Sequence, residues 1–320
     1  MIYLNADTLL NAAALEEIMD VIEQAYAIET EGSFVMPPRM HIDYNNNTLL
    51  YMPCFLETIF GTKILSLFPG NAAKGIPVIS GLVLLNDKNS GHPLAILDGG
   101  RLTALRTGAV GGVAVRHTAP PAAKSAGLVG SGVQGYYQLL FASKARNLET
   151  ISVYDLDQDK VKGFCDRLQK DLPEIEIRPA KKIEDLLDHS EIVITATPSE
   201  KPVLPDDEKL LQNKSYIGIG SYKPEMREFP RSLYKLVDRV LIDTAHGLEE
   251  SGDLITPLQE KWIEPGQILE FGKYLSEEAK TEIPNATTLF KSVGMALFDI
   301  AVGELLYCKA LEKGLGINLD

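Results

Sequence analysis

A glycine loop at residues 130–135, Gly-Ser-Gly-Val-Gln-Gly, has the clearest potential for chemistry in this sequence. It follows a short apolar run, 125–129, and precedes a stretch with helical character. Asp155 stands at the end of the next apolar run, 150–154. A GxGxxG loop between a strand and a helix, with an acidic residue closing the next strand, is typical of dinucleotide binding. The N-terminus of the helix offers N–H groups and partial positive charge to the phosphates.

Each residue of this pattern has a separate predicted task. Gly130 makes the tight turn, Gly132 lets the backbone approach the pyrophosphate, and Gly135 allows the helix to pack closely on the strand. Asp155 would accept hydrogen bonds from the adenosine ribose hydroxyls and repel a 2′-phosphate, so we expect NAD(H) to be favoured over NADP(H). The structural alternative for Asp155 is a helix N-cap.

Four cationic residues form a second group, since each stands beside a predicted turn or strand end in the first third of the chain: Arg39, Lys63, Arg101 and Arg106. The planar fork of arginine suits a carboxylate, and lysine supplies a compact charge. Each residue alone is compatible with a solvated surface position. Together they predict an anionic substrate near the nicotinamide.

The elements that would position these residues follow a βα alternation after the linker 117–124, which contains Pro120-Pro121. Alternating strands and helices predict a parallel sheet with helices on its faces. The predicted strands are 125–129, 150–154, 174–178, 191–196, 215–219 and 239–243. The predicted helices are 136–146, 157–170 and 183–187.

The two ends of the chain have a different pattern. Residues 7–29 predict one or two amphipathic helices, residues 103–116 a helix, and residues 286–313 a long helical stretch that contains Gly294. Strands with an antiparallel pattern are predicted at 48–55, 61–68 and 81–86. We therefore expect an α/β protein with a Rossmann NAD(P)-binding domain at 119–286. Residues 1–118 and 287–320 would pack together as a second, α+β domain, which contains the cations predicted to bind the substrate.

Composition excludes several classes of function. The chain has 320 residues, 45% hydrophobic and 23% charged, with a formal net charge of −13, which disfavours nucleic acid and anionic lipid as partners. Its three cysteines lie far apart, and no histidines show metal-ligand spacing, so we expect neither a disulfide framework nor a metal site. The longest apolar run, 76–85, is about half of what a membrane helix needs. We expect a cytoplasmic protein.

Several stretches of the sequence resemble the ornithine cyclodeaminase/mu-crystallin family, which includes an archaeal-type alanine dehydrogenase and reductases of cyclic imines. The resemblance covers nearly the whole chain, and its ALRTGA and FKSVG motifs are more specific than the glycine loop. The matching stretches are Pro38-Arg39, GTK at 61–63, FPGN at 68–71, LTALRTGA at 102–109, GSGVQG at 130–135 and TLFKSVGMALFD at 288–299.

The resemblance implies a role for each site residue. Arg39 and Lys63 would hold the substrate carboxylate, Arg106 would lie between substrate and cofactor, and Val293 would close the site beside the substrate. Further cofactor contacts would come from Val133, Gln134, Asp155, Thr197, Gly220 and Ser292, together with the loop glycines. The resemblance also implies a homodimer that pairs through the domain without the nucleotide.

One departure from the family pattern concerns the reaction. Members that deaminate an amino acid carry a GADxPGKxEL-like stretch whose aspartate is the catalytic base. The matching segment here, 220–229, has Tyr222 at the aspartate position and Met226 at the lysine position, although Pro224 and Glu228 are retained. A lesser change is Val78, where a threonine often touches the cofactor.

This departure favours reduction of an imine over oxidation of an amine. Oxidising ornithine requires a base that deprotonates an ammonium group near neutral pH, and tyrosine, with an ordinary pKa of about 10, is a poor base there. Reduction of a preformed cyclic imine needs only cations that hold its carboxylate, a hydride from the cofactor and a proton. Tyr222 or Lys63 could supply that proton. We therefore expect an NAD(P)H-dependent reductase of Δ1-pyrroline-2-carboxylate, or of its piperideine analogue. Ornithine cyclodeaminase, alanine dehydrogenase and a cofactor-binding protein without turnover remain the alternatives.

Overall fold

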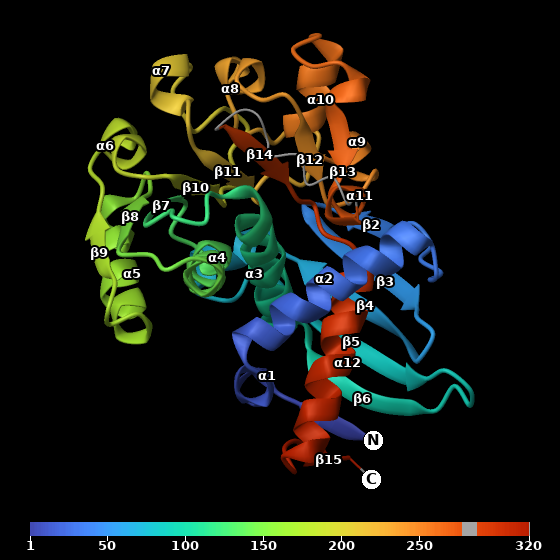
Figure 1. Cartoon of the computed structure of the whole chain (residues 1–320). Helices are drawn as coiled ribbons and strands as arrows, with labels where there is room; N and C mark the ends of the chain where they lie inside the picture. Colours follow the sequence, from blue (N-terminus) through green and yellow to red (C-terminus); the bar gives the residue numbers. More distant parts are fainter. Residues whose placement is uncertain (277–286, 320) are drawn as a thin grey trace. The chain divides into compact units, whose positions relative to one another are not determined.

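The computed structural model describes residues 1–276 and 287–319, and the chain divides into two compact units (Figure 1). Unit 1 comprises Met1–Arg106 and Met295–Asp320, and unit 2 comprises Thr107–Gly294. The first division falls inside helix α3 (Gly99–Thr118), ahead of the proline pair at which the sequence predicted a boundary. The two prolines end the helix, whereas the contacts that define the units change earlier, within it.

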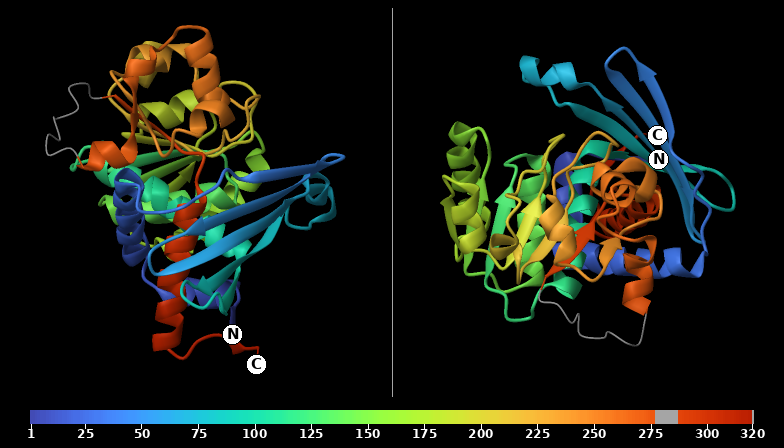
Figure 2. Two further views of the ribbon diagram at one scale, coloured as in Figure 1. Left: turned by 90° about the vertical axis from the view of Figure 1, so that its right-hand side faces the viewer. Right: turned by 90° about the horizontal axis from the view of Figure 1, so that it is seen from above.

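Unit 1 contains a seven-stranded sheet with the order β15-β1-β6-β5-β4-β3-β2. Strands β2 to β6 pair antiparallel; the sequence predicted β3, β4 and β5 with this pattern and missed β2 and β6. Strand β1 joins β6 in parallel, and β15 pairs with β1, so both ends of the chain lie side by side (Figure 2). The strands are β1 (Ile2–Leu4), β2 (Met40–Tyr44), β3 (Asn47–Phe55), β4 (Ile59–Leu67), β5 (Ile79–Asp87), β6 (Pro93–Asp98) and β15 (Ile317–Asn318).

Helices α1 (Ala6–Ala12), α2 (Leu15–Glu31) and α12 (Ala296–Glu312) pack together, and α12 also covers strands β3 to β5. Helix α2 buries an apolar stripe that includes Ile18, Ile22 and Tyr26, the face that the sequence predicted. The ring of Tyr26 meets that of Phe298 edge-on at 4.9 Å between centroids. The core of unit 1 therefore lies between these helices and the sheet. A short 3-10 turn at Pro69–Lys74 joins β4 and β5.

The long helix predicted at 286–313 is wrong. Residue 286 lies outside the described residues, Thr288–Lys291 form strand β14 of unit 2, and the helix begins only at Ala296. Gly294 has a φ of +77°, a left-handed conformation that a continuous α-helix does not contain. The four residues Thr-Leu-Phe-Lys are all buried in the sheet, and the extended chain between β14 and α12 passes from one unit into the other.

Unit 2 contains an eight-stranded, wholly parallel sheet with the order β13-β12-β14-β11-β10-β7-β8-β9. Strands β10, β11 and β14 have four residues each, and all of these residues are buried, which is typical of strands covered on both faces. The strands are β7 (Ser125–Val129), β8 (Thr150–Tyr154), β9 (Glu176–Pro179), β10 (Ile192–Thr195), β11 (Ser215–Gly218), β12 (Val240–Ile242), β13 (Ile268–Glu270) and β14.

Helices alternate with these strands, which confirms the predicted α/β class. They are α4 (Val133–Ala145), α5 (Gln158–Asp171), α6 (Ile183–Asp188), α7 (Glu208–Leu211), α8 (Arg231–Lys235), α9 (Gly247–Glu250), α10 (Gly252–Gln259) and α11 (Phe271–Ser276), with a 3-10 turn at Pro265–Gln267. Within the described ranges, no helix is both long and apolar enough to span a bilayer.

Candidate active site

The glycine loop of unit 2 has the shape that the motif requires. Gly130 has a φ of +105°, and a Cβ on Gly135 would lie 2.3 Å from the carbonyl oxygen of Gly130, so neither position accepts a side chain. A Cβ on Gly132 would meet no atom within 4 Å. The loop therefore packs tightly at its first and third glycines and leaves open space at its second.

Two further features fit a bound dinucleotide at this loop. Helix α4 begins at Val133, immediately after Gly132, so the first N–H groups of a 13-residue helix adjoin the open space. The side-chain oxygen of Gln134 is buried and has no hydrogen-bond partner among the described residues. A phosphate at the loop would accept hydrogen bonds from the N–H groups of the helix, and a ribose hydroxyl would donate one to the oxygen of Gln134.

Asp155 lies just beyond β8, at the edge of the same loop. Its Oδ2 accepts hydrogen bonds from the backbone nitrogen and hydroxyl of Ser131 at 2.7 and 2.8 Å, and its Oδ1 accepts one from the nitrogen of Asp157 at 3.0 Å. Although partial burial acts to raise it, these hydrogen bonds from Asp157 and Ser131 lower the pKa of Asp155. The N-cap of α5 is Asp157, so the helix-cap alternative for Asp155 is wrong.

The remaining predicted cofactor residues stand at the same edge of the sheet. Thr197 follows β10, Gly220 follows β11, and Ser292 directly follows β14, so all three lie beyond the carboxyl ends of parallel strands. That edge is where open α/β sheets bind their ligands. The loop after β7 lies there too, where the chain order reverses between β7 and β10.

Buried carboxylates hold the loops at this edge. Asp243, just after β12, accepts hydrogen bonds from the hydroxyl of Ser292 at 2.7 Å and from the backbone nitrogens of Val293 and Gly294 at 3.0 and 2.6 Å. Burial raises the pKa of Asp243, and the hydrogen bonds oppose that change. Asp243 therefore sets the position of Ser292 and Val293, two of the predicted site residues.

Tyr222 lies in the loop after β11 and is 37% exposed. Burial, and then the charge of Glu225, raise the pKa of its phenol above the ordinary value. The hydroxyl therefore stays protonated at neutral pH. It can donate a hydrogen bond or proton, but it cannot accept one as a base.

Unit 1 contains a buried cluster of charges. Lys63 on β4 donates to Oδ2 of Asp299 at 2.6 Å, and Nε of Arg106 on α3 donates to Oδ1 of the same carboxylate at 3.0 Å. The side chains of Lys63 and Asp299 are 1% and 0% exposed. Buried charges persist only when they are paired, and Asp299 on α12 provides that pairing for both cations.

Opposing effects set the pKa of Lys63. Burial lowers its pKa to about 7, an effect that the charge of Asp299 opposes and that the charges of Arg106 and Arg39 reinforce. Arg39, just before β2, is thus near enough to act on Lys63. Lys63 and Arg106 share one carboxylate and Arg39 adds a further positive charge nearby, and this positive excess suits a carboxylate ligand.

The sequence did not predict the carboxylates that organise these groups. Asp299 lies inside the quoted motif TLFKSVGMALFD, and an acid in the middle of the apolar run ALFDIAVG is a usable signal, because buried acids need partners. Asp243 ends the apolar run RVLID. Glu228 was recognised within its motif without a role.

The whole-chain comparison agrees with this geometry. The model of the ornithine cyclodeaminase/mu-crystallin family matches residues 2–314. The chain belongs to the ornithine cyclodeaminase/mu-crystallin family.

Individual members of the family are similar over almost their full lengths. A Delta(1)-pyrroline-2-carboxylate reductase of Bacillus cereus is 34% identical over 298 residues, 89% of each chain. The Delta(1)-pyrroline-2-carboxylate reductase of Thermococcus litoralis, solved with NADH and L-proline, is 33% identical with a TM-score of 0.93 over 100% of both chains. An archaeal alanine dehydrogenase dimer with bound NAD is 26% identical with a TM-score of 0.90, over 100% of this chain and 99% of that one.

Proposed function

We propose that this protein is an NADH-dependent reductase of cyclic imino acids that converts Δ1-pyrroline-2-carboxylate to L-proline. The observation that carries the proposal is the buried cluster of Lys63, Arg106 and Asp299, with Arg39 close enough to act on Lys63. Its positive excess fits a carboxylate, and its lysine can exchange a proton near neutral pH. The similarity to two pyrroline-carboxylate reductases supports the same substrate.

The cations of unit 1 bind the substrate carboxylate. Arg106 engages Asp299 through Nε alone, so the two terminal nitrogens of its fork are available to a ligand carboxylate. Arg39 adds a second guanidinium. Holding the carboxylate at two cations fixes the orientation of the flat imine ring, and this fixed orientation lowers the entropic cost of the reaction.

Lys63 supplies the proton. NADH, when bound, supplies the hydride that adds to the imine carbon, and the former C=N electron pair then takes a proton on nitrogen. The Nζ of Lys63, with a pKa of about 7, is an effective acid for this transfer at neutral pH. Asp299 holds the ammonium in place and partly stabilises its charge.

Amine oxidation is the poorer fit. It requires a general base, and the position of the family's catalytic aspartate is occupied by Tyr222, whose raised pKa keeps it protonated. A protonated phenol suits imine reduction, because that reaction needs a group that donates a proton or a hydrogen bond to the substrate.

NADH is the proposed coenzyme rather than NADPH. The carboxylate of Asp155 is ionised, and the next residue, Leu156, is 90% exposed and offers no cation to a 2′-phosphate. Oδ1 of Asp155 accepts a single hydrogen bond, from the nitrogen of Asp157, so it can accept a further one from a ribose hydroxyl.

We also propose a cytoplasmic homodimer that pairs through unit 1. The face of its sheet that points away from Lys63 carries a register-aligned row of Met40, Tyr51, Ile64 and Leu82, in which Met40 is 58% and Leu82 45% exposed. An exposed apolar face on a sheet is typical of a protein interface. The archaeal alanine dehydrogenase is a dimer.

A substrate panel tests the proposal. Purified protein is assayed for NADH oxidation with Δ1-pyrroline-2-carboxylate, its piperideine analogue, and pyruvate with ammonia, and for ammonia release from L-ornithine with NAD. We expect turnover with the five-membered imine, with the six-membered analogue next. Reduction of pyruvate alone would assign alanine dehydrogenase, ammonia release would assign cyclodeaminase, and tight NADH binding without any turnover would leave a binding protein.

A further inference from the structure

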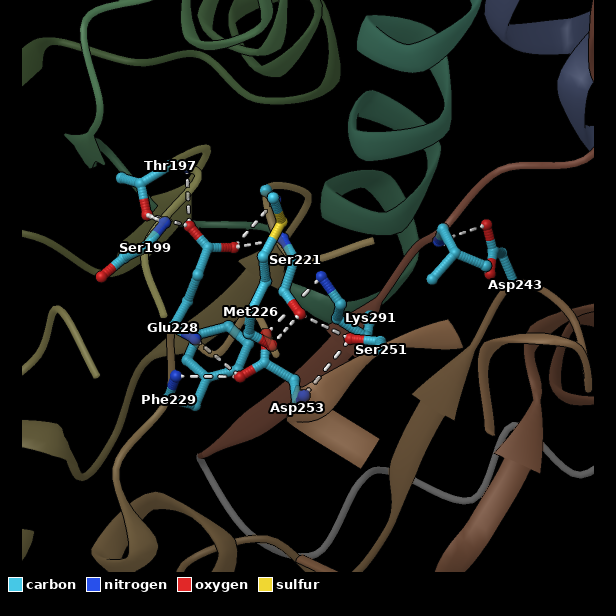
Figure 3. A network of polar contacts seen from close by, with 12 residues as sticks. Thr197, Ser199, Ser221, Met226, Glu228, Phe229, Asp243, Ser251, Asp253 and Lys291 are labelled. Carbon is cyan, nitrogen blue, oxygen red and sulfur yellow. Dashed lines mark hydrogen bonds and ion pairs between the residues drawn. The ribbon is translucent and has the colours of Figure 1, made fainter. Parts of the chain in front are cut away.

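Glu228 bridges the ends of two adjacent strands of unit 2 (Figure 3). It is fully buried, and its Oε1 accepts from the backbone nitrogen and hydroxyl of Thr197 at 2.8 and 2.9 Å. Its Oε2 accepts from the backbone nitrogens of Gly220 and Ser221 at 2.8 and 3.2 Å. Each oxygen thus accepts two hydrogen bonds, so the carboxylate has no capacity left for a ligand or a proton relay.

The two backbones that Glu228 joins are in close contact. A Cβ on Gly220 would lie 2.1 Å from the carbonyl oxygen of Thr197, 2.3 Å from its nitrogen and 2.7 Å from Oε1 of Glu228. Only a glycine fits there. The segments after β10 and β11 therefore form one surface, and Glu228 determines their separation.

A second layer of buried polar groups fixes Glu228 itself. Oδ1 of Asp253 accepts from the backbone nitrogens of Glu228 and Phe229 at 2.8 and 3.0 Å, and Oδ2 lies 3.6 Å from Nζ of Lys291. Burial raises the pKa of both acids, and the charge of Lys291 acts in the opposite direction. Lys291 ends β14, so the network joins three neighbouring strands (Figure 3).

We propose that Glu228 is a positioning residue that fixes Thr197 and the Gly220–Ser221 backbone as the surface for the nicotinamide half of the coenzyme. This inference rests on the proposed function, because that function places a dinucleotide along the carboxyl edge of this sheet. The adenine half belongs to the loop after β7 and to Asp155, which Glu228 does not contact. Glu228 therefore controls affinity for one half of the coenzyme only.

The test compares two ligands that share the adenine half. Glu228→Gln turns one oxygen into an amide that points N–H groups at backbone N–H donors. We expect the dissociation constant of NADH, measured by fluorescence titration, to rise about tenfold or more, while that of ADP, measured by competition, changes less than about twofold. A structural role alone would weaken both ligands equally.

Glu191→Gln is the matched control. Oε2 of Glu191 accepts from the backbone nitrogens of Lys124 and Ser125 at 2.7 and 3.1 Å, and from the Ser125 hydroxyl at 2.9 Å, at the amino ends of β7 and β10. The same chemical change at the opposite edge of the sheet should leave the ratio of the NADH and ADP dissociation constants at its wild-type value.

Asp253→Asn tests the same inference if Glu228→Gln does not fold. The side chain of Asp253 binds the backbone nitrogens of Glu228 and Phe229, so it acts on the proposed surface through Glu228. We expect a smaller loss of NADH affinity, with the affinity for ADP again unaffected. Equal losses for both ligands, or no loss for NADH, would overturn the inference. These titrations contain no imine and therefore test coenzyme binding alone. A protein that binds NADH without reducing the imine would contradict the proposed function, but the effect of these variants on coenzyme affinity would still hold.

Discussion

Burial and pairing with Asp299 set the protonation state of Lys63, on which the proposed proton transfer depends. Lys63 lies on β4, and the aspartate that pairs with it lies 236 residues away in the sequence, on α12. Residue types and motifs were enough to select Lys63, Arg39 and Arg106. They were insufficient to find Asp299, because a pairing across the fold leaves no local spacing to recognise.

The pH dependence of catalysis follows from this pairing. In the proposed mechanism the protonated form of Lys63 is the acid, so kcat/KM for imine reduction should fall as pH rises through about 7, where Lys63 loses its proton. Asp299 raises that pKa, so Asp299→Asn should move the falling limb to lower pH by about one to three units. The measurement is a pH profile of kcat/KM for both proteins.

Two features of this experiment isolate Lys63. The imine has its own titration, which is identical in both profiles, so only the displacement between them counts. Glu304→Gln, on the same helix and bonded to the exposed Thr58, is the control and should not move the profile. An Asp299→Asn profile that overlies the wild type would remove Lys63 as the acid.

Coenzyme choice is likewise assigned to one side chain. Asp155→Ser removes the charge that repels a 2′-phosphate, so kcat/KM with NADPH should rise relative to NADH by about tenfold or more. Steady-state kinetics with both coenzymes measure the ratio. Asp157→Ser, which removes the exposed partner of Lys160, should leave the ratio unchanged, and an unchanged ratio in Asp155→Ser would refute the assignment.

The glycine loop gives a prediction at the scale of the element, because its second and third glycines have different tasks. Gly135→Ala places a Cβ 2.3 Å from the carbonyl oxygen of Gly130, so we expect a loss of roughly 1–3 kcal/mol in the free energy of unfolding. Gly132→Ala enters open space at a negative φ, so stability should be kept while NADH binding is lost.

Thermal melts and NADH titrations of both variants measure these effects. The loop assignment would fail if Gly132→Ala bound NADH as tightly as the wild type, or if Gly135→Ala were as stable.

The strands of unit 2 were predictable as elements because buried parallel strands read as short apolar runs. The C-terminal segment was not. The run TLFK is too short for its periodicity to distinguish a strand from a helix, and the apolar helix that follows made the two look continuous. The glycine at 294, which is left-handed in the structure, marks the break between them.

At the scale of the whole molecule, the sequence implied two units with contributions from both chain ends, and contacts across the fold determined where they divide. A helix that contributes to both units, such as α3, leaves no composition change at the division. The proposed dimer also belongs to this scale, because it would cover the exposed apolar row on the sheet of unit 1.

We predict that disrupting the exposed apolar face of the unit 1 sheet produces a monomer. Leu82→Glu places a charge in the exposed apolar row, and analytical ultracentrifugation should show a shift from dimer to monomer. Leu311→Glu, a similarly exposed leucine on α12, should remain dimeric. A Leu82→Glu protein that stays dimeric would place the interface elsewhere.

The most direct test of the central claim follows a single atom. Δ1-pyrroline-2-carboxylate is incubated with the protein and NADH that carries deuterium at C4 on either face, and the proline formed is analysed by mass spectrometry and NMR. The account predicts L-proline with deuterium at C2 from one of the two labelled coenzymes, at a rate that Lys63→Met lowers about a hundredfold or more. Unlabelled proline, or no proline while L-ornithine is cyclised with release of ammonia, would contradict it.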